Sequence, residues 1–341
     1  MLFPSSTSPD SFIIAEVGQN HQGSVELAKQ YVDIFSAMGA DAIKFQMRDN
    51  KSLFSRDVFD KPYNSENSFG STYGEHREFL ELTVSEMKSL KKRCQEKGVY
   101  FMVTPFDECS LERALEIDVD IIKIASFDLG NLPFLEKINA TGRPVVLSTG
   151  GGRKEHFLQS LQVFNGRGLS LAVLHCVSLY PCPPEKLRLG QLDVLNDLSG
   201  DHALGLSDHF NGILSGPLAF LKGARVFEKH VTMDRSQKGT DHSFSLEPNG
   251  FSKFCRDLRR VPLMFNEGKP SDGSEPVFQK LGKTVVACSE INPGDVFTAD
   301  NIVGKITGEN GVPIRNIGKI LGKKSNRKIS IGKSISLSDA K

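Results

Sequence analysis

Two histidines at the ends of apolar segments are the residues in this sequence best suited to bind a metal ion. His209 closes the segment Gly205-Leu206-Ser207-Asp208-His209, and His230 closes the segment Phe227-Glu228-Lys229-His230. The separation between positions 209 and 230 is too long for one helix face, but it suits neighbouring parallel strands joined by a helix. Two imidazoles at such strand ends can hold a divalent cation and leave positions open for substrate. Each histidine could instead only cap its strand, but their equivalent positions favour the metal site.

Polar side chains also occupy the other apolar segments or the residues that follow them. They are Glu16, Lys44, Gln46, Thr104, Lys123, Ser126, Ser148, Ser178, Tyr180 and Ser207. Two lysines and several hydroxyls that converge would suit a phosphorylated substrate, because the lysines supply charge and the hydroxyls supply directional donors. The alternative is that the lysines pair with buried carboxylates such as Glu16.

Two acidic residues are candidates for proton transfer or for binding a substrate hydroxyl. Glu16 lies inside the first apolar segment. A buried carboxylate there needs a hydrogen-bonding or charged partner, or a role in the chemistry. Asp241 lies in Thr240-Asp241-His242, a polar cluster that follows His230 along the chain.

The elements that must position these residues alternate regularly between strands and helices. The expected strands are 12–18, 42–46, 100–105, 121–126, 144–149, 171–176, 203–208 and 226–231. Eight strand–helix units over residues 12–265 predict an α/β fold, a (β/α)8 TIM barrel, rather than an open doubly wound sheet. Active sites of such barrels lie at the carboxyl ends of the strands, where the polar residues above are found. No GxGxxG motif follows the first strand, which argues against dinucleotide binding.

Two further regions depart from this alternation. The excursion 48–82 is too long for an ordinary connection and is expected to be an active-site loop. After the barrel domain of residues 1–265, residues 266–279 read as a linker, and residues 280–341 read as a small β-rich module.

One motif in this module resembles part of a phosphate-binding loop. Gly282-Lys283-Thr284 matches the end of such a loop, but the position that requires an earlier glycine is Val277, so we reject that interpretation.

Composition limits the class of protein. A formal net charge of +1 over 341 residues gives no global field for nucleic acid or an anionic membrane. No apolar run is long enough to span a bilayer, and the first ten residues do not resemble a signal peptide. The six cysteines form no CxxC pairs, so we expect reduced thiols in a cytoplasmic protein and no structural zinc site.

Nine motifs, in the same order, resemble the sialic acid (N-acetylneuraminate) synthase family from about residue 11 to the end of the chain. They include Ala15–Gly23, Lys44-Phe45-Gln46, Thr104-Pro105-Phe106, Lys123–Ser126, Leu147–Gly150, the segment from His175-Cys176 to Tyr180-Pro181, both histidine segments, and Gly239–Pro248. Residues 280–341 resemble the antifreeze-like (SAF) domain of that family.

The resemblance implies a transferase that forms a carbon–carbon bond. Phosphoenolpyruvate would condense with the open-chain aldehyde of an N-acyl hexosamine to give a nine-carbon 2-keto acid and phosphate. N-acetylmannosamine, its 6-phosphate and a legionaminic acid precursor all fit as the sugar. The excursion resembles the animal branch, which uses the 6-phosphate.

The resemblance also assigns residues. The matching histidines, His209 and His230, would hold a divalent ion, first manganese, with magnesium or cobalt as alternatives. The phosphate of phosphoenolpyruvate would be bound by Lys44, Thr104, Lys123, Ser126, Ser148, Ser178 and Ser207. The sugar would be bound by Glu16, Gln46, Tyr180 and Asp241.

Family members are typically domain-swapped homodimers in which the C-terminal module of one chain covers the barrel of the other. Many carry an Arg-Pro-Gly there, but this chain has Lys305–Glu309 at the matching position, and Arg315 is a possible replacement. Two other interpretations stay open: a phosphoenolpyruvate-dependent synthase for a shorter sugar phosphate, and a non-catalytic carbohydrate-binding protein.

Overall fold

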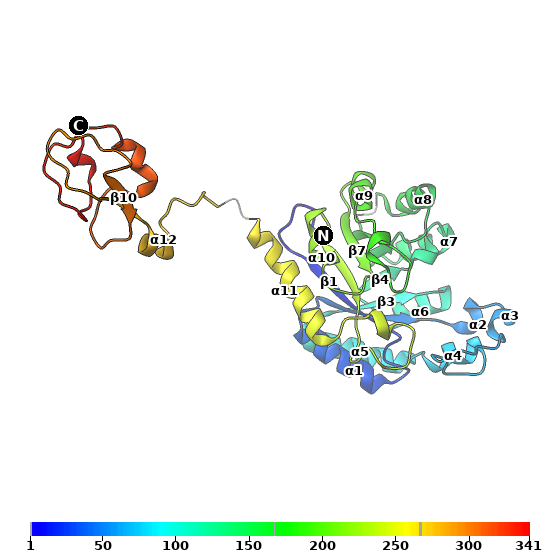
Figure 1. Ribbon diagram of the computed structural model, residues 1–341. Coiled ribbons are helices and arrows are strands. Elements are labelled where there is room, and N and C mark those ends of the chain that lie inside the picture. The colour runs from blue at the N-terminus through cyan, green and yellow to red at the C-terminus, as the bar shows by residue number, and fades with distance from the viewer. Residues whose placement is uncertain (1, 167, 266–267) are drawn as a thin grey trace. The chain divides into compact units, whose positions relative to one another are not determined.

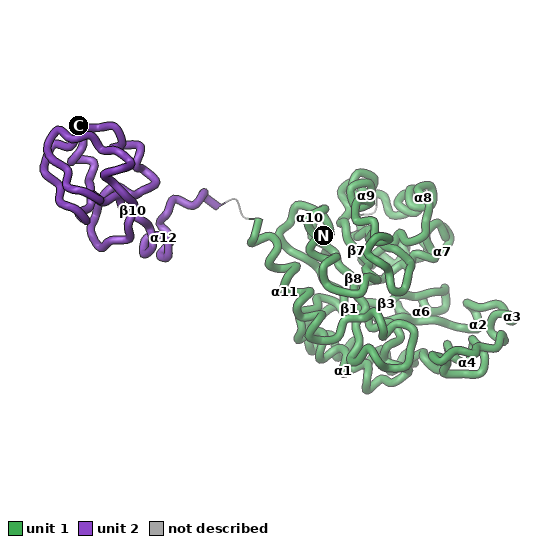
Figure 2. The backbone as a smooth tube through the Cα atoms, in the orientation of Figure 1, with its two compact units in different colours: residues 1–266 green, residues 267–341 purple. Residues whose placement is uncertain are grey.

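The computed structural model describes residues 2–166, 168–265 and 268–341. The chain divides into two compact units, Met1–Asn266 and Glu267–Lys341, which Figure 2 shows in different colours. Within the described ranges, no helix combines the length and the hydrophobicity that a membrane span requires.

Eight parallel strands close into a barrel in the first unit, in sequence order, with β1 paired to β8 (Figure 1). The strands are β1 (Phe12–Gly18), β2 (Ala42–Met47), β3 (Tyr100–Pro105), β4 (Ile121–Ile124), β5 (Val145–Ser148), β6 (Leu171–Cys176), β7 (Ala203–Asp208) and β8 (Val226–His230). The predicted barrel is therefore confirmed. The predicted fourth strand runs two residues too far, because Ser126 begins a 3-10 turn instead of continuing β4.

Eight helices follow the eight strands and cover the outside of the barrel. They are α1 (Val25–Ala37), α5 (Val84–Lys97), α6 (Glu108–Ile117), α7 (Leu132–Ala140), α8 (Lys154–Phe164), α9 (Gln191–Ser199), α10 (Ser215–Leu221) and α11 (Pro248–Met264). The local sequence determines where several of these helices begin or end. The Ser24 side chain accepts a hydrogen bond from the Leu27 amide at the start of α1. Gly98 ends α5 in the left-handed conformation, as its sequence position predicts.

The excursion between β2 and α5 is ordered by three short helices, α2 (Asn50–Leu53), α3 (Arg56–Phe59) and α4 (Tyr73–Phe79). Thr72 and Glu75 form a capping box at the start of α4. The Tyr63 ring lies 4.7 Å from that of His76 and 5.4 Å from that of Tyr73. These contacts give the excursion an aromatic core of its own, in addition to the short helices, which we did not predict from the sequence.

The apolar core has two layers. The larger layer lies between the strands and the helices and includes Phe45, Phe101 and Phe227. A smaller layer fills the amino-terminal part of the barrel interior with side chains such as Ile14 and Met102. Because this end is closed by apolar side chains, polar residues inside the barrel gather toward the carboxyl ends of the strands.

The second unit is a small β-structured body with its own apolar core. It contains α12 (Pro276–Leu281) and two antiparallel strands, β9 (Thr284–Ala287) and β10 (Ile302–Lys305). Isolated bridges and 3-10 turns supply most of its remaining order, and Val285, Phe297 and Ile329 are fully buried in its core. The segment that we expected to be a linker therefore includes a short helix. Arg315 lies over the Phe278 ring of the same unit, at 4.8 Å from its centroid.

Candidate active site

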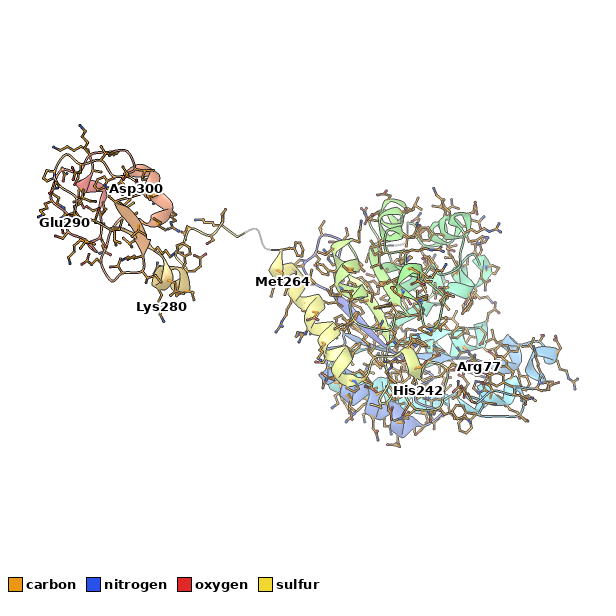
Figure 3. The ribbon with its side chains drawn as sticks, in the orientation of Figure 1. Arg77, His242, Met264, Lys280, Glu290 and Asp300 are labelled. Atoms are coloured by element: carbon orange, nitrogen blue, oxygen red, sulfur yellow. The ribbon has the colours of Figure 1, made fainter. Side chains whose placement is uncertain are left out.

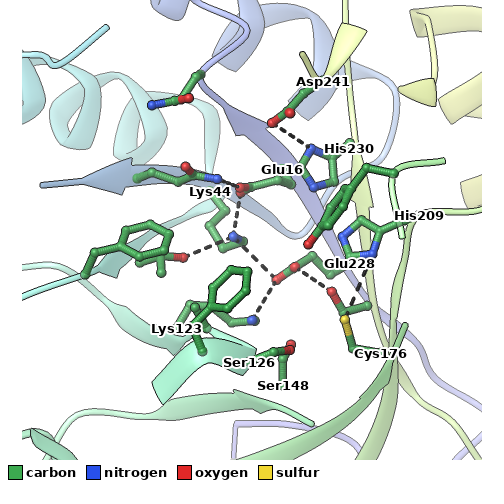
Figure 4. Close-up of a pocket in the computed structure, with 18 of the residues that line it drawn as sticks. Glu16, Lys44, Lys123, Ser126, Ser148, Cys176, His209, Glu228, His230 and Asp241 are labelled. Atoms are coloured by element: carbon green, nitrogen blue, oxygen red, sulfur yellow. Dashed lines mark hydrogen bonds and ion pairs between the residues drawn. The ribbon is translucent and has the colours of Figure 1, made fainter. Parts of the chain in front are cut away.

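A cavity of about 520 Å³ opens at the carboxyl ends of the barrel strands (Figure 4). Its lining includes every residue proposed above from the sequence except Ser178. Ser178 instead lines a neighbouring cavity, and Cys176 borders both cavities. The parallel barrel thus gathers side chains from strands that are far apart in the sequence, although their roles stay predictions.

A network of two buried carboxylates and two buried lysines occupies the centre of the cavity (Figure 4). Glu16 Oε2 lies 2.7 Å from Lys44 Nζ. Glu228 Oε2 lies 3.7 Å from Lys44 Nζ and 4.0 Å from Lys123 Nζ. Ser207 Oγ donates a hydrogen bond of 2.9 Å to Glu228 Oε1. The pairing of lysines with buried carboxylates, which we considered as an alternative to substrate binding, is therefore present inside the candidate site.

Sequence reasoning missed Glu228 as a site residue. The signal was available, because Glu228 and His230 are two positions apart on β8, and alternate residues of a strand face the same side. We instead used Glu228 only as part of the motif that contains the histidine.

Burial and neighbouring charge set the ionisation of this network. Burial acts to raise the pKa of Glu228, but Lys123 and Lys44 outweigh it and lower that pKa to about 2. Burial raises the pKa of Glu16, and the Lys44 ammonium opposes the rise. Burial acts to lower the pKa of Lys44, but the Glu16 and Glu228 carboxylates raise it overall. Glu228 is consequently the firmly ionised carboxylate of the centre.

Two serine hydroxyls, those of Ser126 and Ser178, lie beside Gly150. The Gly150 amide donates a hydrogen bond of 2.9 Å to Ser126 Oγ. Ser148 Oγ and Ser178 Oγ are buried and have no hydrogen-bond partner among the described residues. A Cβ atom on Gly150 would lie only 2.5 Å from Ser178 Oγ and 2.8 Å from Ser126 Oγ, so only glycine leaves room for this arrangement. Unpaired hydroxyls beside a glycine suit the oxygens of an anionic group.

The two histidines face each other, with ring centroids 5.3 Å apart. His209 Nδ1 lies 2.9 Å from the Val177 carbonyl oxygen, so Nδ1 carries the proton and Nε2 keeps its lone pair. His230 Nδ1 is buried without a hydrogen-bond partner, 3.7 Å from Asp241 Oδ2. Burial lowers the pKa of His230, which favours the neutral ring that metal binding requires.

The histidine pair fits a metal site with open positions. Over residues 2–166, 168–265 and 268–341 no group of three or more His, Cys, Asp and Glu side chains has the arrangement of a complete metal site. Two imidazoles would therefore leave most coordination positions to water and substrate. The Tyr180 ring packs against His209 at 4.1 Å and restricts the space beside it.

A second buried ion pair holds the strands that carry the histidines. Lys229 Nζ lies 2.6 Å from Asp208 Oδ2, and both side chains are 1% exposed. Asp208 Oδ1 also accepts a hydrogen bond of 2.8 Å from the Phe210 amide. Since Asp208 precedes His209 and Lys229 precedes His230, this pair fixes the two strand ends relative to each other.

Several cavity residues were not proposed as site residues from the sequence. They are Gln19, Arg48, Asn67, Arg77, Phe106, Phe127, Cys176, Glu228 and Thr240. Three of them, Arg48, Asn67 and Arg77, belong to the excursion, so that segment forms part of the cavity wall.

Comparison with known proteins places the chain among synthases. A family model described as the NeuB family matches residues 31–270. The N-acetylneuraminate-9-phosphate synthase of Homo sapiens is 36% identical over 317 residues, covering 92% of this chain and 88% of the human protein. The N,N'-diacetyllegionaminic acid synthase of Campylobacter jejuni is 31% identical and covers 92% of this chain and 95% of that protein. The crystal structure of an N-acetylneuraminic acid (sialic acid) synthetase from Leptospira borgpetersenii in complex with citrate has a TM-score of 0.67 and 32% identity, covering 78% of this chain and 88% of that one.

Proposed function

The chain belongs to the NeuB family, and from this premise we propose that it condenses phosphoenolpyruvate with the open-chain aldehyde of an N-acyl hexosamine. The products are a nine-carbon 2-keto acid and inorganic phosphate. The observation that carries the proposal is the meeting, in one cavity, of two buried lysines, unpaired serine hydroxyls and two facing imidazoles. The lysines and the serine hydroxyls suit a phosphorylated anion. The two imidazoles suit a metal cation that contacts an aldehyde.

The phosphoenolpyruvate side of the cavity is formed by β2 to β7. We assign its phosphate to Lys44, Thr104, Lys123, Ser126, Ser148, Ser178 and Ser207. Thr104 Oγ1 already accepts a hydrogen bond of 3.1 Å from Lys44 Nζ, which orients the ammonium. The unpaired Ser148 and Ser178 hydroxyls are free to donate to phosphate oxygens.

The sugar side is formed by β1, β2 and the loop after β8. We assign the sugar to Glu16, Gln46, Tyr180 and Asp241. Gln46 Nε2 donates a hydrogen bond of 2.6 Å to Glu16 Oε1, so this pair forms one polar surface for substrate hydroxyls. Gln46 is less buried than Glu16, which places the glutamine nearer the opening of the cavity.

We assign a divalent metal, with manganese first and magnesium or cobalt as alternatives, to His209 and His230. When bound, it would supply Lewis-acid polarisation of the sugar aldehyde. The chain's own contribution is to fix the tautomer of His209 through the Val177 carbonyl, and to favour the neutral ring of His230 through burial, which lowers its pKa. The Tyr180 ring packs beside His209 at the same place.

In the proposed reaction, C3 of phosphoenolpyruvate attacks the aldehyde carbon and forms the new carbon–carbon bond. Positive charge then develops at C2, water adds there, and phosphate leaves by cleavage of its bond to C2. Glu228, ionised well below neutral pH, supplies fixed negative charge for that cationic carbon. The ionised form of Glu16 would also stabilise the positive charge on C2.

The remaining parts of the proposal concern the whole protein. We assign the C-terminal unit to the SAF type, the active form to a domain-swapped homodimer, and the location to the cytoplasm. Nucleic acid and membranes are not among the proposed partners.

The test is phosphate release by purified protein with phosphoenolpyruvate, manganese and a panel of aldoses, with and without a chelator. Chelator-sensitive release only with N-acyl hexosamines supports the proposal. Release with shorter sugar phosphates such as erythrose or arabinose phosphate would assign a different synthase. No release with any aldose, with metal bound, would favour a non-catalytic carbohydrate-binding protein.

A further inference from the structure

A second cavity, of about 540 Å³, lies beside the active site, and apart from Ser178 its lining has no role in the proposed reaction. Most of that lining comes from residues 149–157, which run from the end of β5 into α8, and from residues 175–198, which run from the end of β6 into α9. Cys176 borders both cavities. A cavity of this volume can hold a small organic molecule.

The fixed charges around this second cavity are all positive. Arg153 and Lys154 stand at the start of α8, and Lys186 and Arg188 stand between β6 and α9. Among the described residues that line the cavity, none is an aspartate or a glutamate, and none of the four cations forms an ion pair or a side-chain hydrogen bond. Four positive charges around one cavity attract an anion.

The cationic side chains of the active-site cavity differ, because they already have partners. Arg77 on α4, which Figure 3 labels, donates hydrogen bonds of 2.6 Å to Gln19 Oε1 and of 2.8 Å to the Tyr73 hydroxyl. Lys44 and Lys123 face the buried carboxylates. The four cations of the second cavity, in contrast, keep their hydrogen-bonding capacity for a ligand or for water.

The backbone at Arg188 has an unfavourable conformation. Its φ angle of +50° lies in the left-handed region, which favours glycine and which long side chains rarely adopt. The Nε2 atom of the buried His175 donates a hydrogen bond of 2.7 Å to the Leu187 carbonyl oxygen, and the Gln191 amide donates one of 2.9 Å to the Arg188 carbonyl oxygen. The surroundings therefore hold the strained turn in place. Such strain is typical of positions where a side chain serves binding or catalysis.

Apolar side chains supply much of the remaining wall of the second cavity. Phe157 is 3% exposed and Leu195 is 9% exposed, and both line it. Leu129, Val194 and Leu198 extend the same wall. A ligand that fills this cavity would therefore combine an apolar body with negative charge. A phosphate monoester carries up to about two negative charges at neutral pH, and its oxygens match the planar fork of an arginine.

We propose that the second cavity is a binding site for a small organic phosphate. The phosphate group lies among the four cations, and the apolar body packs against Phe157 and Leu195. Arg188 is the central ligand, because its strained backbone directs an arginine to a place where glycine would fold more easily. This site is separate from the substrates of the proposed reaction and does not depend on that reaction.

The experiment measures binding of 1-naphthyl phosphate by fluorescence anisotropy, with 1-naphthol and inorganic phosphate as the two halves of the probe. We expect the intact probe to bind at least ~10-fold more tightly than either half, because both walls contribute. Arg188→Gly should weaken binding by about 10- to 100-fold, the range for a lost hydrogen bond to a charged group. Lys154→Gln, on the other side of the cavity, should also weaken it. Arg260→Gln, at an exposed position of α11 outside the cavity, should keep the wild-type affinity.

A second measurement separates a binding role of Arg188 from a structural one. The thermal unfolding midpoint, Tm, of Arg188→Gly should equal or exceed that of wild type, because glycine relieves the strained backbone. A lower Tm together with weaker binding would assign Arg188 to the fold and overturn its role as a ligand.

Three other outcomes would overturn the proposal. Failure of the wild type to bind 1-naphthyl phosphate would remove the site. Equal affinity for inorganic phosphate and the intact probe would remove the role of the apolar wall. Loss of binding in Lys123→Gln, with wild-type affinity in Arg188→Gly, would place the probe in the active-site cavity instead.

Discussion

At the scale of single residues, the centre of the site is a firmly ionised carboxylate between two buried ammonium groups. Without substrate, Glu228 lies near both Lys123 and Lys44, and Glu16 also pairs with Lys44, so the two carboxylates compensate the two lysines in the barrel. A substrate phosphate would take over that compensation. The carboxylate would then be available to stabilise positive charge on the substrate carbon.

Replacing this carboxylate should separate catalysis from binding. In Glu228→Gln we expect kcat to fall at least ~100-fold, because fixed negative charge near the cationic carbon is lost. The KM for phosphoenolpyruvate should not rise, since the lysines keep their charge and lose a competing anion. Steady-state kinetics with both substrates measures the two constants. Glu26→Gln, at a surface position with a side chain 74% exposed, is the control. A raised KM with unchanged kcat would contradict the assignment.

Removing one imidazole should remove the metal. In His230→Ala we expect turnover to disappear and manganese content, measured by elemental analysis of the dialysed protein, to fall well below that of wild type. The circular dichroism spectrum should stay native, because the barrel core does not depend on this ring. His156→Ala, on the exposed face of α8, should behave like wild type. Normal turnover in a folded His230→Ala protein would rule out this ligand.

The candidate site residues could be predicted to the extent that they occupy strand ends. His209, His230, Lys44 and Lys123 follow that rule, since a parallel barrel brings all carboxyl ends of its strands together. Arg48 directly follows β2, so the same rule could have found it. Asn67 and Arg77 do not follow the rule, because their positions depend on how the excursion folds back over the barrel, and no periodic pattern in the sequence encodes that path.

At the scale of elements, the two histidine strands are tied together on their outer side by Lys229 and Asp208. In Lys229→Met we expect the free energy of unfolding to fall by about 3–5 kcal/mol, because Asp208 becomes a buried carboxylate without its cation. Denaturant unfolding measures the change. Lys222→Met breaks a surface pair with Asp193 and should cost less than about 1 kcal/mol.

A second substitution distinguishes loss of the ion pair from loss of lysine packing. Lys229→Met combined with Asp208→Asn should recover part of the lost stability, because no uncompensated charge is left. A double variant no more stable than Lys229→Met alone would show that the charge is not the cause.

The strands and most helices could be predicted because buried parallel strands form continuous apolar runs and amphipathic helices repeat with a period of 3.6 residues. The same reasoning did not predict the three helices of the excursion. Its three helices have four to seven residues each, which is too short for a periodic signal, and its order comes from contacts among Tyr63, Tyr73 and His76.

At the scale of the whole molecule, two apolar cores belong to two separate units. Residues 268–275, which precede α12, have no helix or strand, and all of them except Gly273 are exposed. We expect limited digestion with a protease of broad specificity to cut there before it cuts either unit. Mass spectrometry of early time points should show two stable fragments. First cuts inside the barrel unit would contradict this prediction.

The pairing of the first and last barrel strands, here called the seam, has a consequence for synthesis of the chain. β1 pairs with β8, and Glu16 is the register partner of His230 across that seam. The first acidic residue of the site and its last histidine are therefore neighbours in space but more than two hundred positions apart in the order of translation. A nascent chain on the ribosome holds no assembled cavity until its eighth strand has emerged and closed the circle. A polypeptide that ends before β8 consequently lacks both His230 and the closed barrel that brings it to Glu16.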